Sequence, residues 1–467
     1  MKNLSFATAI AGMLVVLTGC VSAPSHDVKV AHTEDYLAGL SFEVSGTTTE
    51  EIRWWEALGD PQLNHLVEKA HAINLDLQAT DRRLQGALAR LGVSKSDLLP
   101  QGGGLGEYNV TERDGESLES ARAGAQISWE LDLFGRIRSV IDARKAGVAN
   151  ARALDRAALK EVTVGVVQAY LRWESARQQV DLIQSDLEAL EVSLQLVRNR
   201  VESGISPRLD LARAEALYHQ QRVLLPIARS NQYRSRATLA VLLGEDPDNL
   251  GLKAVPATLE KARGLPLGER LGQSLQARAD ISAALALLAQ ETALSEAAIS
   301  SLYPQVTVEG FAGITNVQDL GDGFEDTWSA IPRVSWAVLS YPALLKQIDV
   351  QAARTEAQYV SYRKAVVNAV SEARVVADRF SRTVQSERAS TAALQASRRA
   401  YNTAEALYKE GAIGYLDYLD SNREWIAAQR AHLNAQFDLA DSRLGLLREF
   451  SGLWSYGLYE QVKEQDS

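Results

Sequence analysis

The sequence predicts a mixed α/β membrane protein whose four β-strands form part of a barrel shared between copies, and whose long antiparallel helices form coiled coils. Three observations predict this fold. The chain starts with a leader that ends at its only cysteine, its two halves repeat each other, and each repeat joins two strand-like segments to two long helical segments. With 467 residues, 46% apolar and 23% charged, the composition is neither collagen-like nor broadly disordered.

Residues 1–19 have the pattern of a lipoprotein signal peptide. Lys2 supplies a positive charge, and residues 7–17 form an apolar run too short to cross a bilayer. A Leu-Thr-Gly-Cys motif then ends at Cys20, and it resembles the bacterial lipobox, in which the cysteine is acylated. We expect lipidation at Cys20, an acylated tether and equatorial segment over 20–60, and, because Val21 is not Asp, delivery to the outer membrane. The alternative is an ordinary signal peptide followed by an incidental cysteine.

The composition argues against several classes of function. A net charge of −10 does not suit a general nucleic-acid binder. One cysteine allows neither an intramolecular disulfide nor a thiolate metal cage, and both methionines precede it. The histidines lack His-Glu-x-x-His spacing, and the glycine-rich run at 102–106 lacks the Lys-Ser/Thr of a phosphate loop. We therefore expect no enzyme activity, no metal and no cofactor.

The chain contains an internal duplication. Several pairs of identical residues are separated by 207 positions, and Pro100 and Pro304 are separated by 204. The pairs at 207 include Trp129 and Trp336, Gly204 and Gly411, and Asp210 and Asp417. Because chance matches do not keep a constant offset, we expect a first repeat over 61–253, a second over 254–451, and a C-terminal equatorial or tail segment over 452–467.

Each repeat opens with a helix and continues with two strands. Ile127, Trp129 and Leu131 alternate with polar residues, which is the period of a strand with one apolar face. Val334 and Trp336 share a face in the same way in the second repeat. Polar, acidic connectors are expected at 112–119 and 318–326. The sequence thus predicts β-hairpins over 101–133 and 305–340.

A long helical hairpin follows each pair of strands. Apolar residues spaced three and four apart from Val180 to Val201 form a heptad seam, which is typical of a coiled coil. At 1.5 Å per residue, such a helix is on the order of 100 Å long. Gly204 and Gly411 should end the helices in a left-handed conformation. The hairpin tips are therefore expected near 204–207 and 411–414.

Four strands cannot close a barrel, and an open sheet in lipid would leave unpaired edges. Bacterial barrels have about eight strands or more. Sharing one barrel between copies solves this problem, and three copies would supply twelve strands. This count makes a trimer the smallest comfortable assembly, while two or four copies stay open.

Several motifs resemble one family. The lipobox, the Trp54-Trp55 pair, the Asp-Pro-Gln-Leu motif at 60–63 and the run SWELDLFGR at 128–136 look like the TolC-like outer-membrane efflux family, in its lipoprotein (NodT-type) branch. The resemblance covers essentially the whole mature chain. It departs at Ala279, where the family usually has proline, and at 344–347, where Phe-x-x-Gly is usual.

The resemblance implies a homotrimeric channel, with a twelve-stranded outer-membrane β-barrel on a periplasmic α-helical barrel. It implies an exit duct that passively conducts drugs or other small toxic compounds. The implied partners are a periplasmic adaptor (membrane fusion) protein and an inner-membrane pump of the resistance-nodulation-division or major-facilitator type. The alternative is a non-conducting structural or adaptor-like coiled-coil lipoprotein, although adaptors carry one helical hairpin and a compact β domain.

The resemblance also implies roles for residues at the hairpin ends. The pore gate would comprise Leu416, Asp420 and Arg423, with Asp417 ranked lower because it could equally cap a helix. The adaptor-contacting tips would comprise Gly204, Ile205, Ser206, Gly411, Ala412 and Ile413. The spacing of i, i+4 and i+7 places the three main gate residues on one helix face. The alternative for that face is an ordinary amphipathic surface with a weak ion pair.

Overall fold

The computed structural model describes residues 53–113, 116–255, 257–265, 277–317 and 323–450. The predicted signal peptide, the predicted lipidation site Cys20 and the tail at 452–467 lie outside the described residues. The described chain divides into two compact units. The first contains Leu84–Ala151 and Ala283–Lys364, and the second is built from the described parts of Val30–Arg83, Arg152–Ser282 and Ala365–Ser467.

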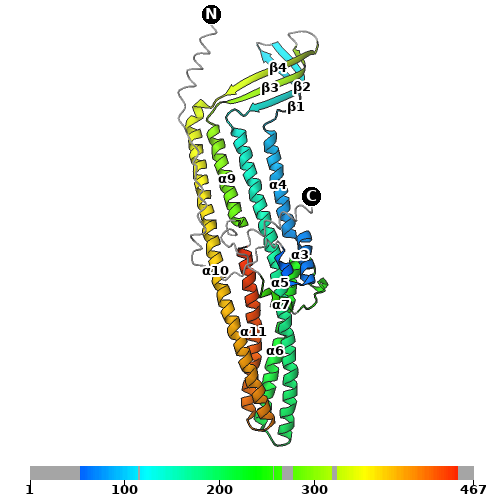
Figure 1. The fold of residues 1–467 in the computed structure, drawn as a ribbon. Coiled ribbons are helices and arrows are strands. Elements are labelled where there is room, and N and C mark those ends of the chain that lie inside the picture. The colour runs from blue at the N-terminus through cyan, green and yellow to red at the C-terminus, as the bar shows by residue number, and fades with distance from the viewer. Residues whose placement is uncertain (1–52, 114–115, 256, 266–276, 318–322, 451–467) are drawn as a thin grey trace. The chain divides into compact units, whose positions relative to one another are not determined.

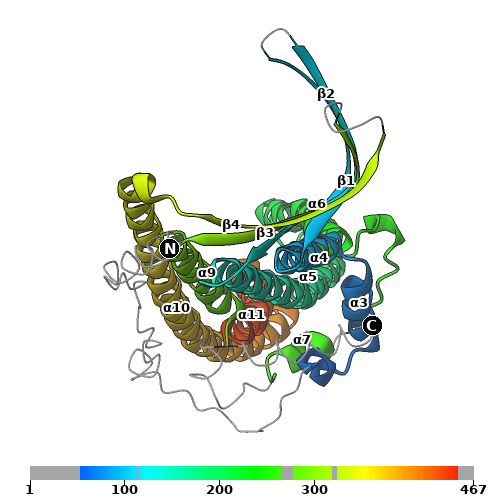
Figure 2. The same cartoon turned by 90° about the horizontal axis from the view of Figure 1, so that it is seen from above.

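The first unit contains a four-stranded antiparallel sheet with the order β1-β2-β3-β4 (Figure 1; Figure 2 shows its strands from above). Its strands are β1 (Gln101–Arg113), β2 (Glu116–Leu131), β3 (Gln305–Val317) and β4 (Glu325–Ser335). In the middle of the sheet, Gly124 lies opposite Gly313. A Cβ at Gly124 would collide with the carbonyl oxygen of Ala312, and one at Gly313 with that of Ala123. The two central strands therefore need glycine at this crossing.

Long helices precede and follow the strands in the sequence, as predicted. They are α4 (Leu75–Ser96), α5 (Arg136–Glu202), α6 (Arg208–Leu242), α9 (Ala279–Ser300), α10 (Tyr341–Lys409) and α11 (Tyr415–Glu449). The shorter elements are η1 (Trp54–Leu58), α3 (Pro61–Ile73), η2 (Pro247–Asn249), α7 (Ala257–Ala262) and η3 (Val338–Ser340). None of the helices in the described chain combines the length and the apolar character needed to cross a membrane.

The strand boundaries correct the predicted hairpins in two places. The connector expected at 112–119 is mostly strand, because β1 extends to Arg113 and β2 begins at Glu116. Polar residues can form these strands because backbone groups make the pairing hydrogen bonds. Their side chains also bond between the two strands: the Tyr108 hydroxyl of β1 donates to Glu119 of β2 at 2.8 Å. The second hairpin ends at Ser335 rather than at 340, because the chain turns into η3.

The predicted heptad seam of α5 is confirmed in the second unit. Four residues of this seam are buried and lie in two clusters: Val180 and Ile183 pack against α6. Leu190 and Val197, which are closer to the hairpin tip, pack against α6 and α11. The corresponding seam of α10 is mostly half-buried, which agrees with its more polar sequence. The stronger seam therefore lies in the hairpin of α5 and α6.

A buried carboxylate organises the start of the second unit. Asp60 has no exposed surface. Its Oδ1 accepts hydrogen bonds from the backbone N–H groups of Gln62 and Leu63, which caps α3. Its Oδ2 accepts from the Tyr170 hydroxyl of α5 and the Thr258 hydroxyl of α7, both at 2.7 Å. One side chain thus joins three helices that are far apart in the sequence.

We expect Asp60→Ala to lower the free energy of unfolding by about 2–4 kcal/mol, because it removes a cap and leaves two buried hydroxyls without their acceptor. The denaturation midpoint of the helical circular-dichroism signal in detergent measures this change. Asp76→Ala is the matched control, since Asp76 is an exposed aspartate in the first turn of α4. Equal midpoints for the two variants would contradict the prediction.

A second buried carboxylate is poorly paired. Asp186 of α5 is 8% exposed. Its Oδ1 accepts only a long hydrogen bond of 3.4 Å from Gln429 of α11, and its Oδ2 has no partner in the described chain. Burial raises the pKa of Asp186 to about 6, although the nearby charge of Arg430 and the hydrogen bond from Gln429 oppose the shift.

Because its folded pKa lies above the ordinary value of about 3.9, Asp186 should make the fold more stable as pH falls through 6 toward 4. That contribution, up to about 3 kcal/mol, is lost above pH 6. Asp186→Asn should therefore be more stable than the wild type at pH 8 and no more stable at pH 4. Unfolding midpoints at both values test this. Asp181→Asn, which changes an exposed aspartate of α5, is the matched control.

Candidate functional site

The ends of the two helical hairpins, in the second unit, share one backbone geometry. Gly204 and Gly411 have φ values of 71° and 76°, in the left-handed region. The next N–H group in each turn donates to a carbonyl in the last turn of the helix: Ile205 to Arg200, and Ala412 to Leu407, both at 2.8 Å. Each helix therefore ends in a Schellman motif made only by the backbone.

Side chains at these tips lie on the surface. Ile205 is 71% exposed, and Ala412 is exposed as well. Ser206 and Ile413 are half-buried. Since the backbone alone makes the turns, the exposed side chains of Ile205 and Ala412 are available to a partner, whereas Ile413 packs against the buried cluster that contains Tyr408 and Tyr415.

An arginine connects the two hairpin ends. Arg200, in the last turn of α5, donates from its guanidinium to the carbonyl oxygens of Tyr408 at 3.2 Å and Lys409 at 3.4 Å. Its guanidinium carbon also lies 4.4 Å from the centre of the Tyr408 ring. These carbonyls end α10, where a positive charge is favoured by the helix dipole.

Aromatic side chains fill the space beside this arginine. The rings of Tyr408 and Tyr418 are stacked with centroids 5.2 Å apart, and Tyr415 lies 5.6 Å from Tyr408. Burial raises the pKa of Tyr415, so its hydroxyl stays protonated at physiological pH. Tyr418, Leu419 and Ile426 of α11 belong to this buried cluster.

The predicted gate residues occupy the other face of α11. Leu416 is 43% exposed, and Asp420 and Arg423 are exposed as well. The Arg423 Nη1 lies 3.8 Å from the Asp420 Oδ1. The structure thus brings the three side chains together on one uncovered face.

The two aspartates at the starts of the returning helices differ. Asp417 is exposed, and no side-chain hydrogen bond caps the start of α11. Its counterpart Asp210 is 9% exposed and lies 3.6 Å from Arg213. The two repeats therefore share backbone turns but not the environment of this carboxylate.

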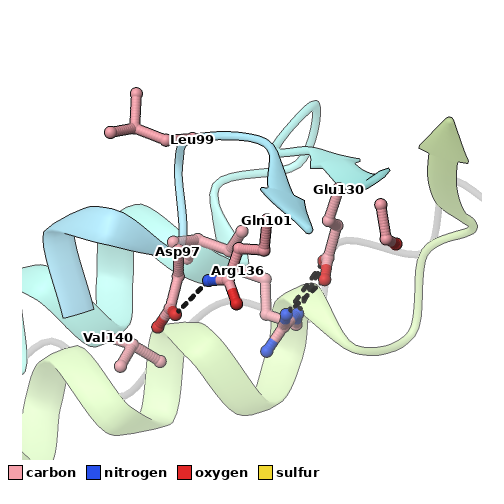
Figure 3. A pocket seen from close by; sticks show the side chains of 8 residues that line it. Asp97, Leu99, Gln101, Glu130, Arg136 and Val140 are labelled. Atoms are coloured by element: carbon pink, nitrogen blue, oxygen red, sulfur yellow. Dashed lines mark hydrogen bonds and ion pairs between the residues drawn. The ribbon is translucent and has the colours of Figure 1, made fainter. Parts of the chain in front are cut away.

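A second candidate site lies at the base of the first β-hairpin, in the first unit. A pocket of about 300 Å³ is lined by Asp97, Gln101, Glu130 and Arg136 (Figure 3). Gln101 donates to Asp97 at 3.1 Å, and Arg136 donates to Glu130 from two nitrogens, from Nε to Oε1 at 3.1 Å and from Nη2 to Oε2 at 2.7 Å. Because its side chains are already paired with one another, we interpret this pocket as a structural junction.

That junction explains the SWELDLFGR run. The indole of Trp129 donates to the Leu98 carbonyl at 2.9 Å, and Asp132 accepts from the backbone N–H groups of Ile137 and Arg138, which caps α5. Gly135 provides the turn with a φ of 78°. In the second repeat, Trp336 donates to Leu302 at 3.0 Å in the same way. The run therefore fixes the passage from strand to helix.

The sequence analysis missed Arg200. The available signal was a basic residue in the last turn of a helix, just before a glycine turn. In the part of the chain that the structure describes, no group of three or more His, Cys, Asp or Glu side chains could hold a metal ion.

Comparisons with known proteins agree with this architecture. The model of the "Outer membrane efflux protein" family matches residues 66–245 and 271–449. The pyoverdine export outer membrane protein OpmQ of Pseudomonas aeruginosa is 27% identical over 480 residues, which cover 97% of each chain. The toluene efflux pump outer membrane protein TtgF of Pseudomonas putida is 27% identical over 466 residues, covering 94% of this chain and 95% of the relative.

Solved structures have the same fold. The outer-membrane channel OprN matches with a TM-score of 0.82 at 27% identity, covering 94% of this chain and 98% of that one. The open state of the MtrE outer membrane channel of Neisseria gonorrhoeae matches with a TM-score of 0.80 at 25% identity, covering 93% and 99% of the two chains. The predicted fold class, the outer-membrane location and the resemblance to TolC-like channels are confirmed. The family match spans more than half of the chain, which therefore belongs to the outer membrane efflux protein family as the exit duct of an efflux pump.

Proposed function

We propose that three copies of this chain form one passive duct, which receives small toxic compounds from a periplasmic adaptor and an inner-membrane pump of the resistance-nodulation-division or major-facilitator type. The uncovered face of α11 is the observation that carries this proposal, because a channel needs a lining that no part of its own chain covers. Relatives named for pyoverdine export and toluene efflux support small organic molecules as cargo.

The sheet supports assembly of copies. In one chain β1 and β4 are the outer strands, so each has one edge without a partner strand among the described residues. The sheet also exposes large apolar side chains, including Trp328 at 80% and Ile331 at 51%. Three such sheets would give a twelve-stranded barrel, which pairs all edges and places apolar side chains against lipid.

The gate proposal rests on the apolar and charged side chains of α11 near the tip of its hairpin. Leu416, Asp420 and Arg423, with Asp417 one position after Leu416, would form rings of apolar and charged side chains in a trimer. Arg200 holds the end of α10 against the end of α5, and so resists outward movement of α10 and α11. We assign the adaptor contact to the tips, at 204–206 and 411–413, because their side chains are not needed for the turns.

Planar bilayers containing the purified protein should show a small conductance, and a protein with only a structural role should show none. Arg200→Ala should raise the conductance several-fold because it frees the end of α10, and Asp420→Ala should raise it because it removes a constricting side chain. Controls are Arg198→Ala, which changes a neighbour of Arg200 whose side chain is 42% exposed, and Asp438→Ala, about 27 Å farther along α11. Absence of conductance in all variants would contradict the duct.

Acylation of Cys20 is a separate expectation. Cells grown with labelled palmitate should incorporate the label into the wild type and not into Cys20→Ala, because the chain has no other thiol. Sedimentation of membranes then measures how much anchoring the acyl chains supply beyond the strands. Equal labelling of the two proteins would show that the motif at Cys20 is not a lipobox.

A further inference from the structure

A pocket in the second unit has a charge opposite to that of the whole protein. It has a volume of about 520 Å³ and lies between α5, α6 and the segment after η2. Trp173, Arg229, Gln232, Tyr233 and Arg236 line it. This volume falls in the range of sites that hold ligands of the size of a drug or a short sugar chain.

The arginines of this pocket belong to a strongly basic part of α6. From 216 to 242 the chain contains four arginines and no Asp or Glu, although the protein carries a net charge of −10. None of the four makes an ion pair or a side-chain hydrogen bond with another described residue, and the Nε of Arg236 is buried without a partner there. These cations are therefore not neutralised by the described fold.

The spacing of the side chains constrains the ligand. Arg229 and Arg236 are seven residues apart on one helix, so they lie on the same face and about 10.5 Å apart along the axis. One small anion cannot reach both, whereas an extended molecule with several carboxylates can contact each guanidinium through two hydrogen bonds.

Aromatic side chains complete the pocket. Tyr233 lies between the two arginines in sequence and is 51% exposed, and Trp173 of α5 forms the wall. The amide of Gln232 adds a donor and an acceptor. Flat apolar surfaces beside polar groups suit a molecule that has both ring faces and charged groups.

We propose that this pocket binds the carboxylate-bearing glycan and peptide polymer of the cell wall. The helices lie in the periplasm, where that polymer is the extended polyanion carrying both sugar rings and free carboxylates. Binding would hold the long periplasmic part of the duct laterally, which is a role separate from conduction. It depends on the location of α6 in the periplasm and not on the gate.

Cosedimentation of the full, acylated protein in detergent with purified cell-wall sacculi tests the proposal. We expect the wild type to bind at low salt and to dissociate in 0.5 M NaCl, a concentration that screens charge contacts. Arg229→Gln/Arg236→Gln should bind about a hundredfold more weakly, since it removes two contacts to charged groups and each contributes roughly one factor of ten. Tyr233→Ala, which keeps the charge, should also bind more weakly.

Two controls separate the pocket from general charge. Arg208→Gln/Arg234→Gln removes the same charge from exposed residues of α6 outside the pocket, and should bind as the wild type does. Sacculi whose carboxylates have been converted to amides should not bind the wild type. Bilayer conductance of Arg229→Gln/Arg236→Gln should be unchanged, which shows that the protein is folded and that the duct is intact.

Three outcomes would overturn the proposal. They are failure of the wild type to bind sacculi, equal weakening by the two double arginine variants, and binding to amidated sacculi. Dissociation of the oligomer in Arg229→Gln/Arg236→Gln, detected by light scattering, would also overturn it, because the arginines would then face a second copy. These binding and light-scattering results do not depend on the conductance experiment, so failure of this proposal can be distinguished from failure of the proposed duct.

Discussion

Backbone hydrogen bonding at the outer strands is the constraint on which the rest of the architecture depends. A sheet in lipid cannot leave N–H and C=O groups without partners, and this chain supplies only four strands, with β1 and β4 at the edges. The chain cannot meet that requirement alone. Assembly of copies, as proposed above, would give each outer strand a partner.

The two repeats have the same hydrogen bond at the end of the β-hairpin but differ in how their first long helix begins. Trp129 and Trp336 make equivalent hydrogen bonds at the ends of their hairpins. The starts of α4 and α9 differ, because Asn74 caps the first, whereas the equivalent position in the second holds the buried Arg278. Arg278 contacts Asp280, Glu372 and Glu449, so the second repeat fixes the same helix start with a charged network.

Much of this fold was accessible from sequence because its signals are periodic. The seam from Val180 to Val201 and the alternation around Trp129 report directly which side chains are buried. Strand ends were less accessible, since the polar residues at 112–119 pair through the backbone and leave no trace in hydropathy. The roles of Arg200 and of the basic part of α6 depend on which segments meet in space, and a single sequence carries little information about that.

The backbone turns at Gly204 and Gly411 have a consequence for how such proteins diversify. Because main-chain atoms alone close each turn, residues such as Ile205 and Ala412 can be exchanged at little cost to folding. With the adaptor contact at the tips that we propose, a new partner would require changes in these side chains alone, and the architecture that carries them would stay constant.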